Sequence, residues 1–257
     1  MNYECFKVTI KEYIATVTYD RPPVNAQNRR SREELIHIFD SLSDNDAVRV
    51  IILTGAGKSF SAGADVKERA GMDKEDGEYI RHNRVTREYF YAVEDCAKPV
   101  ITAVNGPAIG AGFCLMMSGD IILASENTFV AMTEVDVGLS GGMKFLTAHF
   151  GRSYARYIYY TGQRIPASEL YRLGVIQACV PQDQLMEAAM KIARDIAAKS
   201  PLAIQTAKRG FNAVAEMPGR DAYRYEQGLT VMLSKTEDTK EAQAAFVEKR
   251  KPVYKGR

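Results

Sequence analysis

Hydrophobic residues in the first half of the chain mark out a series of short strands. The segment FKVTIKEYIATVTYD alternates apolar and polar positions and predicts two strands joined at Lys11-Glu12. Continuous apolar runs at residues 50–55, after Pro99, in DIILAS and in TFVAMTE predict further strands that are buried on both faces.

Helical spacing appears between these strands. In SREELIHIFDSLSDND the apolar residues share one helical face, Ser31 has the position of an N-cap, and Glu34 follows three residues later. A second helical pattern covers about residues 78–95. Because strands and helices alternate at short separations, the sequence predicts an α/β fold.

The pattern becomes purely helical after Val180. Residues 181–199 carry apolar positions at helical spacing, and three more helix-like segments follow, without a linker rich in Gly, Ser or Pro. The sequence therefore predicts a body over residues 1–195 and a C-terminal helical region over 196–257. Such a region either covers its own body or packs on another subunit, and the pattern leaves both open.

The overall composition argues against several classes of protein. Of the 257 residues 46% are hydrophobic, which is enough for a substantial core, and the net charge of +2 gives no reason to expect nucleic acid as a partner. The chain has no apolar run of transmembrane length and its first residues, MNYECFKVTIKEY, are not a signal peptide, so we expect a cytoplasmic protein that does not bind membranes. The four cysteines lack metal-ligand spacing, and we expect no metal site.

A turn of small residues, GKSFSAGADVKERAG, follows the predicted strand at residues 50–55. Its Gly57-Lys58-Ser59 triplet resembles the end of a phosphate-binding P-loop. That motif requires a glycine five residues before Gly57, where this chain has Ile52. The sequence therefore argues against a nucleotide-binding P-loop.

A second turn of small residues lies in VNGPAIGAGFCLMMSGD. Gly110-Ala111-Gly112 leads into a segment that is apolar on all sides, which predicts a buried helix with unpaired N–H groups at its start. The glycine spacing differs from the Gly-x-Gly-x-x-Gly pattern of dinucleotide sites.

The two turns have two interpretations. They can aim two backbone N–H groups, one of them that of Ala64, at an oxygen that becomes negative during a reaction. Alternatively, they only allow strands and helices to pack closely. Because turns of small residues are common, spacing alone favours the packing interpretation.

Four motifs in order carry a family resemblance: SFSAGADVKE, KPVITAVNGPAIGAG, GDIILAS and MTEVDVGL. Together they resemble the crotonase superfamily, the enoyl-CoA hydratase/isomerase family, and the closing EAQAAFVEKRKPVYKG resembles the C-terminus of the hydratases. The resemblance covers nearly the whole chain. It implies a crotonase-like spiral of ββα units with a C-terminal helical trimerisation region, and a homotrimer or homohexamer.

The resemblance also implies the reaction. An acyl-CoA would be the substrate, with coenzyme A as part of it and no separate cofactor. By motif position, the backbone N–H groups of Ala64 and Ala111 would polarise the thioester, and Glu134 in MTEVDVGL would transfer the proton.

Further residues are implied in binding the substrate and its CoA part, by backbone contacts, by charge or by their place in the motifs. They are Val24, Ala26, Lys58, Ala62, Lys67, Gly110, Phe246 and Lys249.

Two departures from the family pattern affect the expected reaction. Cys114 stands where hydratases commonly carry a second glutamate, and the VGLSGGMKF loop after Glu134 is shorter than usual. A thiol orients water poorly. We therefore expect an enoyl-CoA hydratase-type enzyme, with a Δ3,Δ2-enoyl-CoA isomerase that uses Glu134 alone as the alternative. A non-catalytic acyl-CoA-binding scaffold is a third hypothesis.

Overall fold

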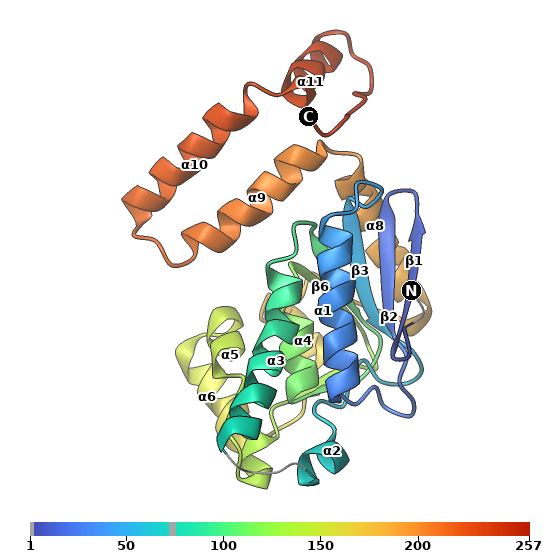
Figure 1. Ribbon diagram of the computed structural model, residues 1–257, viewed down its shortest axis with the longest axis vertical. Helices are drawn as coiled ribbons and strands as arrows, with labels where there is room; N and C mark the ends of the chain where they lie inside the picture. The colour runs from blue at the N-terminus through green and yellow to red at the C-terminus, as the bar shows by residue number, and fades with distance from the viewer. Residues whose placement is uncertain (1–2, 72–75) are drawn as a thin grey trace.

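Most of the predicted strands form one large sheet in the body of the molecule, and the run in TFVAMTE belongs to a second, smaller sheet (Figure 1). The computed structural model describes residues 3–71 and 76–257. Strands β1 and β2 are antiparallel, and the other neighbouring strands of the large sheet are parallel. In spatial order the strands are β1 (Phe6–Lys11), β2 (Ile14–Tyr19), β3 (Val50–Gly55), β4 (Val100–Val104), β6 (Ile121–Ser125) and β9 (Ala178–Val180).

A smaller sheet has the order β5-β7-β8. Its strands are β5 (Ala108–Ile109), β7 (Phe129–Ala131) and β8 (Ile165–Pro166). Strand β5 runs directly into the second turn of small residues, and β7 ends three residues before Glu134. The parallel pairing of β5 with β7 therefore brings these two segments together.

Helices connect the strands and form the C-terminal third of the chain. In chain order they are α1 (Arg29–Ser43), α2 (Val66–Ala70), α3 (Asp76–Glu94), α4 (Ala111–Met117), the 3₁₀-helix η1 (Glu134–Val137), α5 (Met143–His149), α6 (Arg152–Thr161), α7 (Ala167–Arg172), the 3₁₀-helix η2 (Gln182–Gln184), α8 (Leu185–Ala197), α9 (Pro201–Val214), α10 (Gly219–Leu233) and α11 (Glu237–Val247).

Both faces of the large sheet are covered, because its central strands are apolar on both sides. In β3, Val50 and Ile52 belong to a core shared with α8. Ile51 and Leu53 belong to the other core, shared with α1, α3 and α4. Full burial of one such side chain is worth about 1.5–3 kcal/mol, so these two cores account for much of the stability of the body.

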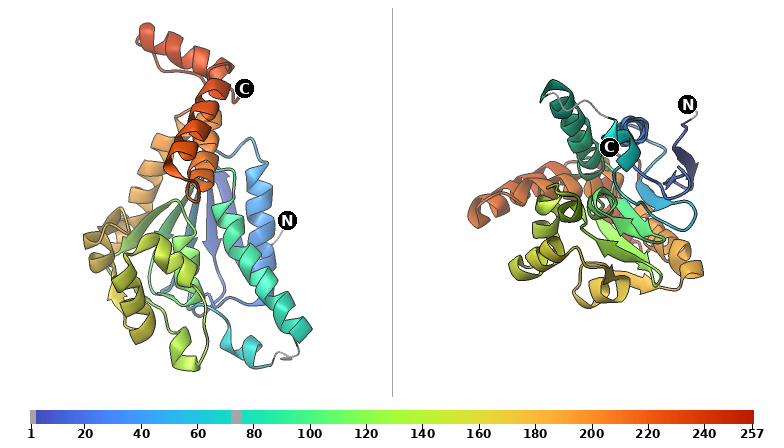
Figure 2. Two further views of the ribbon diagram at one scale, coloured as in Figure 1. Left: turned by 90° about the vertical axis from the view of Figure 1, so that its left-hand side faces the viewer. Right: turned by 90° about the horizontal axis from the view of Figure 1, so that it is seen from below.

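The C-terminal helices form an arm. Helices α9 and α10 pack on each other and extend from one end of the body, with α11 beyond them (Figures 1 and 2). The buried Lys208 of α9 fixes the arm to the body, since its Nζ lies 2.9 Å from Asp120 Oδ2 and donates to two backbone carbonyls. Asp238 accepts hydrogen bonds from the backbone N–H groups of Lys255 and Gly256 and so holds the end of the chain against α11.

The structure confirms the predicted α/β fold and its purely helical end, but the start of α1 was predicted wrongly. Asn28, not Ser31, is the N-cap: its side chain accepts the backbone N–H of Ser31 at 2.9 Å. Helix α8 packs on the sheet, and the division at residues 195/196 stays a prediction. Within the described residues, no helix is both long and apolar enough to cross a membrane.

Candidate active site

The two turns of small residues lie side by side. Ile109 donates its backbone N–H to the carbonyl of Ser61 at 3.0 Å, and Ser61 and Ala108 form a parallel bridge. A Cβ atom on Gly63 would lie 3.3 Å from the backbone N of Ala111, and one on Gly112 would collide with the carbonyl of Ser61. Small residues are therefore required here because two backbones approach each other.

The N–H groups of Ala64 and Ala111 are free on this packed pair of turns. Within residues 3–71 and 76–257, neither backbone N–H donates a hydrogen bond. Ala111 is the first residue of α4, so its N–H has no partner inside the helix. Both residues are half-buried, so the two N–H groups can be reached from outside, and a pair of unpartnered N–H groups suits a ligand oxygen.

Residues 24–27 hold the first turn in place through the backbone. Ala62 donates to the carbonyl of Val24 at 2.9 Å, Gln27 to that of Gly63 at 2.7 Å, and Asp65 to that of Gln27 at 2.9 Å. The expected contact residue Val24 is therefore next to the Ala64 turn.

Two buried amide side chains complete this support. Asn25 donates to the carbonyls of Ala56 and Ser59 at 3.0 and 2.8 Å. Gln27 Nε2 donates to the carbonyl of Ala111 at 3.0 Å and thereby joins the two turns. Sequence reasoning missed both residues. The available signal was two amides, Asn25 and Gln27, within four residues of Pro22-Pro23, a place where backbone turns commonly need side-chain partners.

Glu134 brings a carboxyl group to the second turn. A Cβ atom on Gly110 would lie 2.6 Å from Glu134 Oε1, so the carboxyl group lies against the residue that precedes Ala111. Glu134 Oε2 is buried without a hydrogen-bond partner among the described residues. Burial raises the pKa of Glu134, while backbone N–H groups and the positive charge of Arg69 oppose part of that rise. A raised carboxyl pKa suits a group that both accepts and donates a proton near neutral pH.

Cys114 is buried beside this carboxyl group. Its thiol has a raised pKa, first because it is buried and second because of the charge of Glu134. A Cβ atom on Gly142 would lie 2.8 Å from Cys114 Sγ. The shortened loop after Glu134 thus packs directly on the thiol.

Comparisons with known proteins extend this picture. A family model described as enoyl-CoA hydratase/isomerase matches residues 9–257. The chain belongs to the enoyl-CoA hydratase/isomerase family. It is 37% identical over 93% of its length to the (7aS)-7a-methyl-1,5-dioxo-2,3,5,6,7,7a-hexahydro-1H-indene-carboxyl-CoA hydrolase of Rhodococcus jostii, of which 92% is covered. It is 34% identical to the carnitinyl-CoA dehydratase of Escherichia coli over 99% of both chains.

Solved structures of the family share the whole fold. The enoyl-CoA hydratase of Bacillus anthracis has a TM-score of 0.94 with this chain at 33% identity, over 99% of this chain and 100% of that one. An enoyl-CoA hydratase/isomerase from Mycobacterium paratuberculosis has a TM-score of 0.92 with this chain at 30% identity, over 100% of both chains. These matches confirm the predicted crotonase-like fold and its C-terminal helical region.

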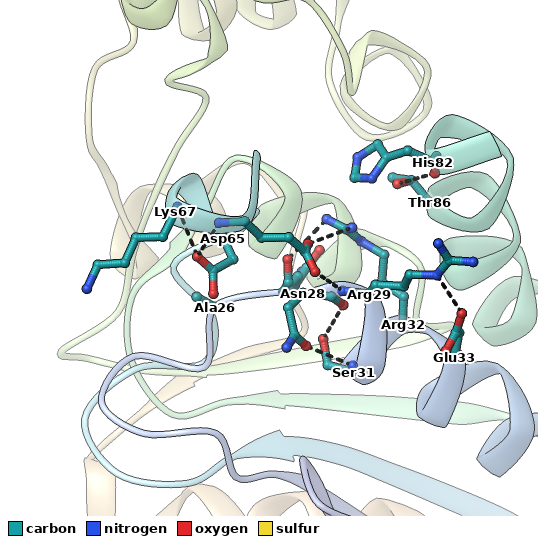
Figure 3. A network of polar contacts seen from close by, with 12 residues as sticks. Ala26, Asn28, Arg29, Ser31, Arg32, Glu33, Asp65, Lys67, His82 and Thr86 are labelled. Carbon is teal, nitrogen blue, oxygen red and sulfur yellow. Dashed lines mark hydrogen bonds and ion pairs between the residues drawn. The ribbon is translucent and has the colours of Figure 1, made fainter. Parts of the chain in front are cut away.

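Within one chain, only some of the residues expected to contact CoA lie near the two turns. Ala26, Ala62 and Gly110 lie on the supporting loop and the two turns. Lys58 and Lys67 are exposed near the first turn, and in Figure 3 the Lys67 side chain extends away from Arg32 and His82.

Phe246 and Lys249 do not reach this region in the same chain. Phe246 lies in the last turn of α11 and Lys249 follows two residues after the end of that helix. Helix α11 is at the far end of the molecule from α2, which directly follows the Ala64 turn (Figures 1 and 2). The physical reason is that the arm carries α11 outward instead of folding it back. Their expected role in binding therefore requires a second subunit and stays a prediction.

Proposed function

We propose that this chain is an enoyl-CoA hydratase-type lyase in which Glu134 transfers protons and the N–H groups of Ala64 and Ala111 hold the thioester oxygen. The observation that carries the proposal is the packing of the Glu134 carboxyl group on Gly110, one residue before the free N–H of Ala111. A proton-transfer group and a site for developing negative charge thereby lie next to each other.

The reaction follows from these two features. Glu134 takes a proton from water as the water oxygen bonds to C3 of the 2-enoyl group. The electron pair of the C2–C3 double bond moves toward the thioester oxygen, where the two N–H groups stabilise the enolate, each by roughly 3 kcal/mol. The protonated Glu134 then returns its proton to C2. The reverse sequence removes water, and the name of the E. coli relative, a dehydratase, is in line with it.

The alternative is a Δ3,Δ2-enoyl-CoA isomerase, which the thiol at position 114 favours. Within the described residues near Glu134, Cys114 takes the place in which hydratases carry their second carboxylate. Isomerisation needs only one base, which takes a proton from C2 and returns it to C4. The unpartnered buried carboxyl oxygen of Glu134 argues against a non-catalytic scaffold, because a binder gains nothing from leaving it unsatisfied.

A spectrophotometric screen separates these reactions. The protein is incubated with 2-enoyl-CoA and 3-enoyl-CoA esters of several lengths, and with a cyclic acyl-CoA because the R. jostii relative is named for a bicyclic one. Loss of the conjugated thioester absorbance from a 2-enoyl-CoA supports hydration. Its appearance from a 3-enoyl-CoA supports the isomerase. No change with any ester would contradict both.

We further propose that the arm assembles the protein into a trimer or a pair of trimers. Several large apolar side chains of the arm are exposed in the single chain, among them Phe211 at 75%, Tyr223 at 64% and Phe246 at 85%. Apolar surface of this extent is typical of subunit contacts. Assembly would also supply the second subunit that Phe246 and Lys249 need in order to contact CoA. Coenzyme A enters as part of the substrate, and the proposal needs no further cofactor.

A further inference from the structure

A second group of charged residues lies outside the Glu134 site, where α1, α2 and α3 meet. It surrounds a pocket of about 120 Å³ lined by Arg29, Arg32, Glu68, Glu78, Arg81, His82 and Val85. Figure 3 shows Arg32 and His82, which come from α1 and α3, beside one another. A water molecule occupies about 30 Å³ of liquid, so the pocket has room for a small ion.

Arg32 is the unusual member of this pocket. It is only 2% exposed, and its Nε has no hydrogen-bond partner in the part of the chain that the structure describes. Its NH2 donates to the carbonyl of Gln27 at 3.1 Å, but its NH1 lies 3.8 Å from Glu68 Oε2, too far for a hydrogen bond. A buried guanidinium group with most of its donors unused is costly unless an anion completes its contacts.

The charge balance and the local backbone also favour an anion. Arg29 is paired with Glu33 at 2.8 Å and Arg81 with Glu78 at 3.3 Å. Among the described lining residues, Arg32 is the one arginine without a carboxylate within hydrogen-bond distance. Glu68 is already engaged, because its Oε1 accepts the backbone N–H of Arg29 at 2.8 Å. Arg29 opens the fifteen-residue helix α1, so the positive end of the α1 dipole points at the same place.

One arginine influences both this pocket and the proposed catalytic group through its charge. Burial lowers the pKa of His82, and the positive charges of Arg32 and Arg69 lower it further. The positive charge of Arg69 also opposes the rise in the pKa of Glu134, so the same arginine affects both groups. Arg69 and Glu68 both belong to α2, the short helix that begins two residues after Ala64.

We propose that the pocket between α1, α2 and α3 binds a carboxylate group. The carboxylate is either carried at the far end of the substrate's acyl group or supplied by a free small organic acid. The planar guanidinium of Arg32 matches two carboxylate oxygens, and Arg81 and His82 provide further donors from α3. The proposal that the substrate carries the carboxylate rests on the proposed function. The proposal that a free acid binds does not.

Binding is tested first without any CoA ester. The full-length protein is labelled at its histidine rings, because it has only three, His37, His82 and His149. Acetate should shift the NMR signals of His82 and leave those of the other two in place, whereas acetamide, which is uncharged, should shift none. Arg81→Gln should weaken acetate binding about tenfold, the loss expected for one charge-assisted hydrogen bond.

Arg84→Gln is the matched control. It removes the same charge from the same helix, but Arg84 does not line the pocket, so acetate affinity should stay unchanged.

The source of the carboxylate is tested with a pair of substrates. Two 2-enoyl-CoA esters of equal length are compared, one ending in a carboxylate and the other in its methyl ester. If the substrate carries the carboxylate, the acid has a kcat/KM about tenfold higher or more. The ratio then falls toward one in Arg81→Gln but not in Arg84→Gln. If the carboxylate is a free acid, acetate shifts His82 and the two esters react equally well.

If acetate does not shift the His82 signals and the enzyme does not prefer the ester that ends in a carboxylate, the proposed carboxylate binding is contradicted. A retained His82 shift in a protein that turns over neither ester would overturn the proposed function and leave the carboxylate pocket standing.

Discussion

The carboxyl group of Glu134 lies against the α-carbon of Gly110, so closely that a Cβ atom there would be 2.6 Å from Oε1. Gly110 also has a φ of +53°, in the left-handed region that side chains disfavour. Glycine at this position thus allows the carboxyl group to reach the residue that precedes Ala111. The space at Gly110 is as much a part of the proposed site as the carboxyl group itself.

Gly110→Ala should therefore inactivate the enzyme by displacing Glu134. We expect a fall in kcat of about 100-fold, at the lower end of what a misplaced acid/base group causes. Gly174→Ala is the control, because Gly174 also has a positive φ but a Cβ atom there would meet nothing within 4 Å among the described residues. Gly174→Ala should lose only about 1–2 kcal/mol in the free energy of unfolding, because of backbone strain, and should keep its kcat. Equal kcat values in the two variants would contradict the role of Gly110.

The raised pKa of Glu134 predicts a pH-dependent effect on stability. Because the folded-state pKa exceeds the ordinary value of 4.5, the ionised form destabilises the fold. This penalty is absent below the unfolded pKa and appears as pH rises through it toward the folded pKa. Glu134→Gln should therefore raise Tm at pH 7 by a few degrees, given about 2–4 °C per kcal/mol, and by less at pH 4. If calorimetry gives the same change in Tm at both pH values, the claim that ionised Glu134 destabilises the fold is contradicted.

Cys114 should act only by packing. Cys114→Ala leaves a small void against Gly142 and Met132, and we expect a loss of about 1 kcal/mol in the free energy of unfolding with most activity kept. The measurement is the turnover rate on the best ester from the screen, with circular dichroism as the check on folding. A hundredfold drop in a folded variant would show that the thiol takes part in the reaction.

The exposed apolar residues of the arm predict assembly. Light scattering at micromolar protein should give three or six times the 28.6 kDa of one chain. A mass of one chain would contradict the proposed trimer. It would also leave Phe246 and Lys249 without a route to the CoA site.

The sequence predicted the parts of this site that depend on local pattern. Both turns were recognisable because glycine and alanine follow strands that are apolar on both faces, and Glu134 followed from its motif. The amide of Gln27 was not predictable, since its partner Ala111 is 84 residues away and only tertiary packing brings them together. The N-cap of α1 was misplaced by one turn because Asn28 and Ser31 are both good capping residues and periodicity does not choose between them.

The direction in which the arm extends could not be predicted from the sequence either. Apolar helical spacing after Val180 is the same whether a helix covers its own body or another subunit. It therefore left open that α8 packs on the sheet while α9 and α10 leave the body. For the same reason the motif positions of Phe246 and Lys249 could not show that one chain holds them far from the Ala64 turn.

The central claim is that Glu134 is the group that moves protons, and turnover by Glu134→Gln tests it most directly. The variant keeps the shape of the side chain and removes only its ability to titrate. On the best ester from the screen, kcat should fall by ~10²–10⁴-fold while acyl-CoA binding, measured by calorimetry, stays close to that of the unaltered protein. Turnover near the unaltered rate by the purified variant would contradict the account.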